Sequence, residues 1–307
     1  MPLQAFSNLG KMNRELIGFL YGLAAYGFWG ILPVYWKQFP QVSSAEVLCH
    51  RIFWCFGFTG ILLFFDRALR KQWRELEIRQ IKSLILSAVC IGVNWLIFVW
   101  AVQTNQIVDA SLGYFICPLM MAAIGVLVLK EKLNHLQYFA IFLAGMGVLW
   151  LTVQFGSLPW IGLGLAFTFS IYSLLRKTSG LNSLHGLFLE TMILSIPSLI
   201  YFIYLKMHDS LYLFHHTRYD DLLLVGAGIV TALPLWWFAH AAGRLQLATL
   251  GLMQYIAPIL QFLVGVVLYQ EVFSQTHQIG FSLIWCGLAL YIYNQVRTFG
   301  VSYRVAA

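Results

Sequence analysis

Charged residues are scarce in this chain. Asp, Glu, Lys and Arg make up 10% of its 307 residues, whereas a soluble domain typically carries about a quarter. Hydrophobic residues make up 60%, and the mean hydropathy is +0.76. These values exclude an ordinary soluble protein. The net charge of +7 belongs to no soluble basic segment, so we expect no nucleic-acid partner.

Paired cysteines and catalytic motifs are also missing. The five cysteines fall within apolar runs and lack the spacing of a zinc site or a disulfide framework. The eight histidines do not form the clusters that a membrane metalloenzyme needs, and no GxxxxGK[ST] loop for nucleotide phosphates occurs. We therefore expect no metal, no cofactor and no enzymatic activity. A membrane-embedded enzyme or a receptor without transport activity stays the alternative.

Long uncharged runs recur along the whole chain. Each is long enough to cross a hydrocarbon core of about 30 Å, which takes roughly 20 helical residues. Such segments must be helical, because backbone groups in lipid need partners within their own segment. The predicted all-α membrane protein has ten spans, at 15–36, 45–65, 83–103, 110–129, 134–153, 158–175, 185–205, 221–240, 247–269 and 274–296.

Lys and Arg residues gather on alternate loops, which predicts how the spans are oriented. With the N-terminus inside, most of them, including Arg176, fall on the inner side. Only Lys37, Lys206 and Arg218 fall on the outer loops. Because cytoplasmic loops retain an excess of positive charge, both termini are expected in the cytoplasm.

The two halves of the chain resemble each other. The segment SLGYFICPLMMAAIGVLVLKEKL (111–133) is similar to TLGLMQYIAPILQFLVGVVLYQEVF (249–273), with an offset of 138 before the proline and 140 after it. The offset of 140, which we call the repeat offset, pairs Pro118 with Pro258, Gly125 with Gly265, Glu131 with Glu271, and Gly147 with Gly287. Internal similarity of this kind indicates a repeated unit.

Five spans in each half have a topological consequence. After an odd number of crossings, the second copy enters the membrane from the opposite side. The sequence thus predicts two inverted five-helix repeats, residues 1–153 and residues 154–307. Many secondary transporters have this architecture, and their binding sites lie between the repeats.

Five short stretches carry a resemblance to a known family. In chain order they are HRIFW, NWLIFVWAV, ASLGYF, GSLPWIGLGLAF and ETM. They resemble the RarD branch of the EamA-type drug/metabolite transporters, and the similarity covers nearly the whole chain. The resemblance implies export or exchange of small metabolites in the bacterial inner membrane. Amino acids, related amphipathic compounds and drugs such as chloramphenicol are the candidate substrates it favours.

Ionisable side chains inside the spans are the first candidate functional residues, because a charge at the centre of a membrane helix costs about 2.5–3.5 kcal/mol on insertion scales. Four qualify: Glu46, His50, Arg51 and Glu190. Glu46 and His50 share one helix face, whereas Arg51 points about 100° away from His50. We expect Arg51 to bind a substrate carboxylate. Glu46, His50 and Glu190 are expected to serve proton coupling or gating.

A structural role is the alternative for these residues. In that interpretation Glu46 caps the outer end of its span, and Arg51 extends its head group to the outer interface. Static ion pairs inside the bundle are a further option. Because the repeats are inverted, Arg51 and Glu190 should lie about 9 Å from opposite boundaries, so we expect no direct pair between them.

Polar and aromatic side chains near the predicted repeat interface complete the candidate substrate site. They are Asn94, Trp95, Tyr114, Tyr172, Trp236, Gln254 and Tyr255. Packing between helices is the alternative for each. Pro118 and Pro258 are expected to kink or unwind their spans. The partners we expect are the bilayer, a small-molecule substrate and, as a candidate coupling ion, the proton, with the protein as a monomer or homodimer.

Overall fold

A computed structural model of the protein describes residues 2–64, 78–130, 133–179, 181, 183–242, 244–245 and 253–305. Within these ranges the chain forms helices and no strand. The helices are α1 (Pro2–Trp36), α2 (Ser44–Leu63), α4 (Ile78–Gln103), α5 (Ile107–Leu129), α6 (His135–Phe155), α7 (Trp160–Ser179), α8 (Ser183–Met207), α9 (Arg218–Ala242), α11 (Ile256–Leu263), the π-helix η1 (Val264–Leu268) and α12 (Gln275–Val305). Each predicted span overlaps a helix, and α11 with η1 covers the ninth. The start of the ninth span and Glu131 lie outside the described residues.

Seven of the helices are long and apolar enough to cross a membrane: α1, α2, α4, α5, α6, α8 and α9. Two further apolar helical segments, Trp160–Arg176 and Ile256–Leu268, are shorter over the residues described. The all-helical prediction is therefore confirmed. The ten-crossing inverted arrangement stays a proposal.

Several charged and polar side chains are buried inside the bundle, and many large apolar side chains are exposed on its surface. Large apolar side chains point outward at successive turns of α6, among them Phe142, Met146 and Leu149. Arg51 and Glu190, in contrast, are buried. An apolar surface of this extent is stable only in apolar surroundings, because exposing it to water is unfavourable. The chain is a multi-pass membrane protein.

Local signals set where several helices begin and end. α2 follows Ser43, whose hydroxyl accepts a hydrogen bond from the amide of Glu46. α6 starts with a reciprocal capping box between Asn134 and Gln137. It ends at Gly156, whose φ of 68° is a left-handed conformation that glycine adopts without strain.

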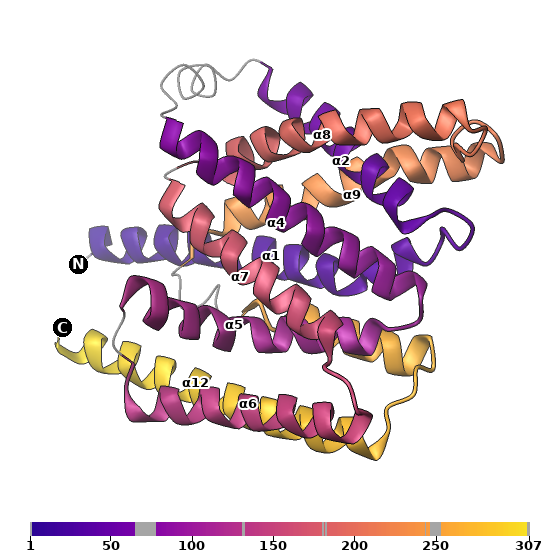
Figure 1. Ribbon diagram of the computed structural model, residues 1–307. Coiled ribbons are helices and arrows are strands. Elements are labelled where there is room, and N and C mark those ends of the chain that lie inside the picture. The colour runs from indigo at the N-terminus through magenta and orange to yellow at the C-terminus, as the bar shows by residue number, and fades with distance from the viewer. Residues whose placement is uncertain are drawn as a thin grey trace.

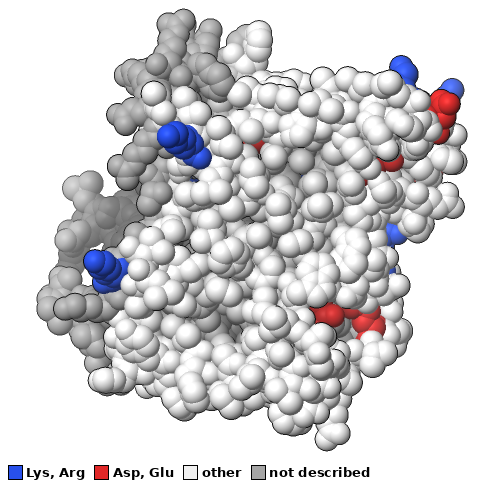
Figure 2. Space-filling view, viewed as in Figure 1, with Lys and Arg blue, Asp and Glu red and all other residues white. Residues whose placement is uncertain are grey.

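The chain starts and finishes at the same end of the bundle. The beginning of α1 and the end of α12 both lie at the left of Figure 1, which we call the termini end. The loops after α1, α4, α6, α8 and η1 lie at the opposite, far end. On the face that Figure 2 shows, most acidic atoms lie toward the far end.

Helix contacts join the first half of the chain to the second. α6 packs along α12, α2 along α8, and α5 against α11. α1 contacts α9 and α11, while α7 contacts α4 and α5. α2 also contacts α9, and α4 contacts α8. The buried polar side chains of α2, α4, α7 and α8 therefore lie where the two halves meet.

Glycines allow the close approach of α6 and α12 at two places. A Cβ atom added at Gly147 would lie 2.7 Å from the carbonyl oxygen of Gly280. A Cβ atom added at Gly287 would lie 2.5 Å from the carbonyl oxygen of Ala140. The two contacts are related by exchange of the helices, because the repeat offset pairs Gly147 with Gly287 and also pairs Ala140 with Gly280.

Candidate functional site

The charged residues near the start of α2 divide between two sides of the helix. The Glu46 carboxylate accepts the amide of Tyr212 at 2.7 Å, from the loop that follows α8. His50 lies below it on the same side, whereas Arg51 faces α1 and α4. This divergence follows from the rotation of about 100° per residue in an α-helix.

His50 is buried against α8. Its Nδ1 accepts a hydrogen bond from Trp54 Nε1 at 3.2 Å, and its ring lies 4.6 Å from that of Phe202. Its Nε2 is 3.8 Å from Glu46 Oε1, which is too long for a hydrogen bond. Glu46 and His50 therefore share a helix face but no hydrogen bond. Glu46 binds the far-end loop through the Tyr212 amide, whereas Ser43 caps α2.

Arg51 lies between two tryptophan rings. Its guanidinium carbon is 5.0 Å from the ring centroid of Trp36, the last residue of α1, and 4.1 Å from that of Trp95 in α4. Tyr114 of α5 interacts with it electrostatically. Only 5% of Arg51 is exposed, so its head group does not extend to the interface. We call Trp36, Arg51, Trp95 and Tyr114 the Arg51 cluster.

Three donors of this cluster have no hydrogen-bond acceptor within the part of the chain that the structure describes. They are Nε and Nη1 of Arg51 and Nε1 of Trp36, all of which are buried. Buried donors in native proteins are almost always satisfied. The Arg51 cluster therefore holds three buried donors that a ligand with acceptor atoms would satisfy.

Asn94 connects Tyr114 of the Arg51 cluster to α7. Its Nδ2 donates to the Leu165 carbonyl and to Thr168 Oγ1 of α7, both at 2.9 Å. Its Oδ1 accepts from the Tyr114 hydroxyl at 3.4 Å. Asn94 thus joins α4 to α7 and positions Tyr114, and its amide nitrogen is occupied by protein acceptors.

Glu190 belongs to a second cluster at the meeting of α4, α7 and α8. Its Oε1 lies 3.7 Å from Arg176 Nε and accepts the hydroxyl of Ser87. Its Oε2 accepts the hydroxyl of Tyr172 at 3.4 Å. We call Ser87, Tyr172, Arg176 and Glu190 the Glu190 cluster. Glu190 is fully buried, but it is not the isolated acid that its apolar surroundings in sequence suggest.

Arg176 and Ser87 are residues that the sequence interpretation missed. Arg176 directly follows an apolar run and was expected on the inner side, yet it lies within α7 and turns toward Glu190. Space for its head group comes from Gly186, since a Cβ atom there would overlap the guanidinium. Ser87 carries no distinctive sequence signal. The pairing of Glu190 with Arg176 agrees with the expectation that Glu190 does not pair with Arg51.

Three predicted site residues lie apart from both clusters. Trp236 is 41% exposed on α9 and packs against His240. Tyr255 is buried in an apolar cluster with residues of α5, α6 and α12, and Gln254 precedes it in the turn before α11. No hydrogen bond, ion pair or ring contact among the described residues joins them to Arg51 or Glu190.

The two predicted kink residues differ in their surroundings. α5 continues through Pro118, where the missing amide leaves the Tyr114 carbonyl without its usual helical donor. The chain before Pro258 forms a turn, and α11 begins only at Ile256. Pro258 therefore lies in the first helical turn, where an amide donor is not needed.

Polar contacts between the two halves hold the far end together. Both carboxylate oxygens of Glu271 accept amides at the start of α5, from Ile107 at 2.9 Å and from Val108 at 2.8 Å. A carboxylate is favourable at a helix N-terminus, where the backbone amides point outward. Within the first half, Lys37 also donates to Asn105 at this end. Burial lowers the pKa of the Lys37 ammonium, and the Glu271 carboxylate opposes this shift.

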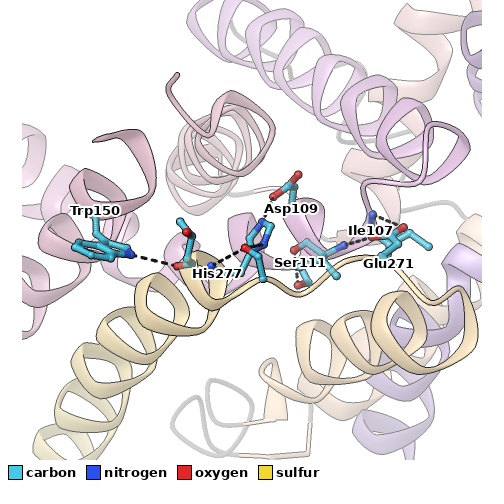
Figure 3. Close-up of polar contacts among 9 residues, drawn as sticks. Ile107, Asp109, Ser111, Trp150, Glu271 and His277 are labelled. Carbon is cyan, nitrogen blue, oxygen red and sulfur yellow. Dashed lines mark hydrogen bonds and ion pairs between the residues drawn. The ribbon is translucent and has the colours of Figure 1, made fainter. Parts of the chain in front are cut away.

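Further far-end contacts connect α5 and α6 with the start of α12. His277 Nε2 lies 3.7 Å from Asp109 Oδ1, and Trp150 Nε1 donates to the Thr276 carbonyl at 3.3 Å. Figure 3 shows these contacts beside the one made by Glu271. These contacts connect the two halves of the chain at the far end.

Comparison with known proteins identifies the family. A model of the EamA-like transporter family matches residues 16–153. Protein RarD of Streptomyces exfoliatus is 40% identical over 290 residues, which cover 93% of this chain and 91% of that protein. The chain belongs to the EamA family.

Another relative of this EamA protein is an uncharacterized transporter of Vibrio cholerae, 41% identical over 279 residues that cover 89% of this chain and 91% of the relative. A solved crystal structure shares the fold with a TM-score of 0.52 at 19% identity, and the match covers 89% of this chain and 96% of the other. The chain is accordingly a membrane transporter of the drug/metabolite superfamily.

Proposed function

We propose that this protein is a secondary active transporter that moves a small amphipathic metabolite across the bacterial inner membrane by alternating access. Amino acids and related compounds are the candidate substrates, together with drugs such as chloramphenicol. The observation that carries the proposal is a symmetry in the helix packing: the most extensive helix contacts keep their pattern when the two halves of the chain are exchanged.

The proposed repeats are residues 1–153 and 154–307. Exchange replaces α1 by α7, α2 by α8, α4 by α9, α5 by α11 and α6 by α12. The contact of α1 with α9 then becomes that of α7 with α4, and the contact of α1 with α11 becomes that of α7 with α5. The contact of α2 with α9 becomes that of α8 with α4, while the pairs α2–α8, α5–α11 and α6–α12 map onto themselves.

Individual residues support the same exchange. Ser170 Oγ lies 3.4 Å from the carbonyl oxygen of Cys117. Gly30 is the counterpart of Ser170 at the repeat offset, and Ala257 directly precedes Pro258 as Cys117 directly precedes Pro118. A Cβ atom on Gly30 would lie 3.2 Å from the Ala257 carbonyl oxygen. In the first contact α7 meets α5, which contains Pro118. In the second, α1 meets α11, which contains Pro258.

Two further observations support the boundary between the repeats. Lys130 and Gln270, again paired by the repeat offset, both adopt positive φ angles, of 55° and 53°. The family model ends at residue 153, close to the end of α6, so the matched family unit corresponds to the first five long helices.

Alternating access follows from two inverted repeats, because each can adopt the conformation of the other and so reverse the side on which the site opens. The bonds of Glu46, Glu271 and His277 across the far end would hold an outward gate closed and would break when that gate opens. Following the charge rule, we assign the termini end to the cytoplasm. The proposed substrate site is the Arg51 cluster.

Energy for transport would come from a gradient, and Glu190 is the candidate proton carrier. Its carboxylate is fully buried, and the Arg176 guanidinium lies beside it as a counter-charge for the ionised form. Glu190→Gln keeps the shape of the side chain but cannot titrate. Flux through this variant should lose its pH dependence, and an unchanged pH dependence would contradict the coupling role.

Reconstituted flux tests the proposed function. Purified protein in proteoliposomes should move at least one solute of a metabolite panel that includes amino acids, organic acids and chloramphenicol. Joining Asp109→Cys and His277→Cys with a short cleavable cross-linker should stop that flux, because the far end could no longer open. Each single-cysteine variant, treated in the same way, is the control, and cleavage of the linker should restore transport. An enzyme or a receptor would give no flux in any of these preparations.

A further inference from the structure

We infer, building on the proposed transport function, that the Arg51 cluster binds small organic carboxylates of net charge −1 with an aromatic or apolar body, in preference to zwitterionic amino acids. Nothing in the family match names a substrate charge. The inference rests on the unpaired donors of the cluster, on its net charge and on the side chains that surround it.

The unpaired donors specify an acceptor. Arg51 contributes Nε and Nη1, and Trp36 contributes Nε1 from a different helix. Leaving such buried donors without partners is unfavourable, and all three would be satisfied by a group that only accepts. A carboxylate has two oxygens with about four lone-pair sites, and it matches the planar fork of a guanidinium.

The charge of the cluster specifies a net anion. The guanidinium stays protonated in proteins, and the faces of Trp36 and Trp95 offset part of the cost of its burial through cation–π contacts. Two buried carboxylates of the bundle are engaged elsewhere: Glu46 binds the Tyr212 amide, and Glu190 pairs with Arg176. A bound monoanion would therefore make the cluster neutral.

A zwitterionic amino acid would fit the cluster less well. Its carboxylate would satisfy Arg51, but its ammonium group would remain as a new buried charge. Asn94 already directs its amide nitrogen at α7 and receives the Tyr114 hydroxyl on its oxygen. No free carboxylate faces Arg51 within the described ranges, so the ammonium would find no counter-charge.

The neighbours of the cluster specify the body of the ligand. Tyr114 makes edge contacts with Phe98 and Phe169, with ring centroids 5.8 and 6.2 Å away. Phe98 and Trp36 belong to one apolar cluster of the bundle. Inorganic phosphate or sulfate could offer oxygens to Arg51 but has no apolar part to place against these rings. Small ligands usually bind where a few polar groups fix them among apolar walls.

A matched ligand series tests this inference. The probes are phenylacetate (anion), phenylacetamide (neutral), phenylalanine (zwitterion), inorganic phosphate and sulfate. Binding to the detergent-purified full chain is measured by calorimetry at pH 7, and uptake of the same compounds is measured in proteoliposomes. Because a charged partner would be lost, phenylacetate should bind about 30-fold or more tightly than phenylacetamide. It should also bind more tightly than phenylalanine.

Three variants assign the effect to the unpaired donors. Arg51→Gln should weaken phenylacetate binding by about 30-fold or more. Trp36→Phe keeps a ring beneath Arg51 but removes Nε1, and it should weaken binding by about tenfold. Trp285→Phe is the matched control, because it removes another buried and unpaired indole donor, on α12. It should leave the affinity unchanged, and a monodisperse elution profile with an intact melting transition checks the fold of each variant.

The outcomes separate this inference from the proposed function. Flux of some solute with equal affinity for phenylacetate and phenylacetamide, or with an unchanged Arg51→Gln variant, would keep the transporter and overturn the carboxylate site. Tighter binding of phenylalanine, phosphate or sulfate than of phenylacetate would also overturn it. Selective phenylacetate binding that Arg51→Gln abolishes, without flux of any solute, would support the site and contradict transport.

Discussion

Arg51 on α2 and Glu190 on α8 are buried charged residues on helices that pack together, but they differ in their polar partners. Arg51 lies seven residues after the first residue of α2, and Glu190 lies seven residues after the first residue of α8. The carboxylate has Arg176, Ser87 and Tyr172 as partners. Among the described residues the guanidinium lies against the faces of Trp36 and Trp95, and two of its nitrogens have no acceptor. The protein thus supplies polar partners to Glu190, and we propose that a ligand supplies them to Arg51.

The two charges differ in the residue that faces each of them. Trp36, which faces Arg51, and Arg176, which faces Glu190, are paired by the repeat offset and lie at the ends of helices that exchange in the proposed symmetry. A ring therefore lies against one charge and a counter-ion against the other. The two charges themselves are one position out of step, because the repeat offset pairs Glu190 with His50.

Removing the satisfied charge should have the largest effect on stability. Glu190→Ala leaves the half-buried Arg176 without its carboxylate partner, so the free energy of unfolding should fall by about 3–5 kcal/mol. Chemical denaturation in detergent micelles measures this change. The double variant Glu190→Ala with Arg176→Met should recover much of the loss, because it removes both charges. Losses that simply add in the double variant would show that the two residues do not stabilise each other.

The symmetry that makes the two regions comparable can be tested at the α6–α12 contact. Gly147→Ala and Gly287→Ala each push a Cβ atom against a backbone carbonyl of the facing helix. Each should lower the free energy of unfolding by about 1–3 kcal/mol, and the two losses should be similar. Gly145→Ala on α6 is the control for helix propensity, since nothing lies within 4 Å of the added atom. A loss at only one of the two glycines would contradict the proposed exchange.

Removing the unsatisfied charge should have the smallest effect and the opposite sign. Arg51→Met fills similar space and removes two unpaired nitrogens, although it also removes the contacts with Trp36 and Trp95. We expect the ligand-free protein to gain about 1 kcal/mol, measured as a higher unfolding midpoint. Destabilisation as large as that of Glu190→Ala would mean that Arg51 has a structural partner and is not held ready for a ligand.

Much of the architecture could be predicted from the sequence. Uncharged runs predicted where the helices lie, because lipid leaves the backbone no other way to satisfy its hydrogen bonds. The rotation per residue separated Arg51 from Glu46 and His50. The expected grouping of Arg51 with Trp95 and Tyr114 agrees with the structure, whereas Trp236 and Tyr255 face other surroundings.

Which side chains contact each buried charge was harder to predict from the sequence, because that depends on geometry. One residue turns a side chain by about 100°, so uncertainty of a residue or two at a helix end decides whether Arg176 faces the cytoplasm or Glu190. Trp36 appeared to be only the end of an apolar run, and Ser87 one small residue among many. Their roles depend on which helices pack together across the two halves of the chain.

The sequence by itself determined that the chain is a helical membrane protein with an internal repeat and a few ionisable groups inside its spans. These properties follow from the solvation of backbone and side chains, which is local, and from the similarity of two segments. Only the tertiary structure decided that Glu190 has a counter-ion and that Arg51 has none among the described residues. Pairing requires atoms from separate helices to come within a few ångströms, and the rotation and packing of those helices set that distance.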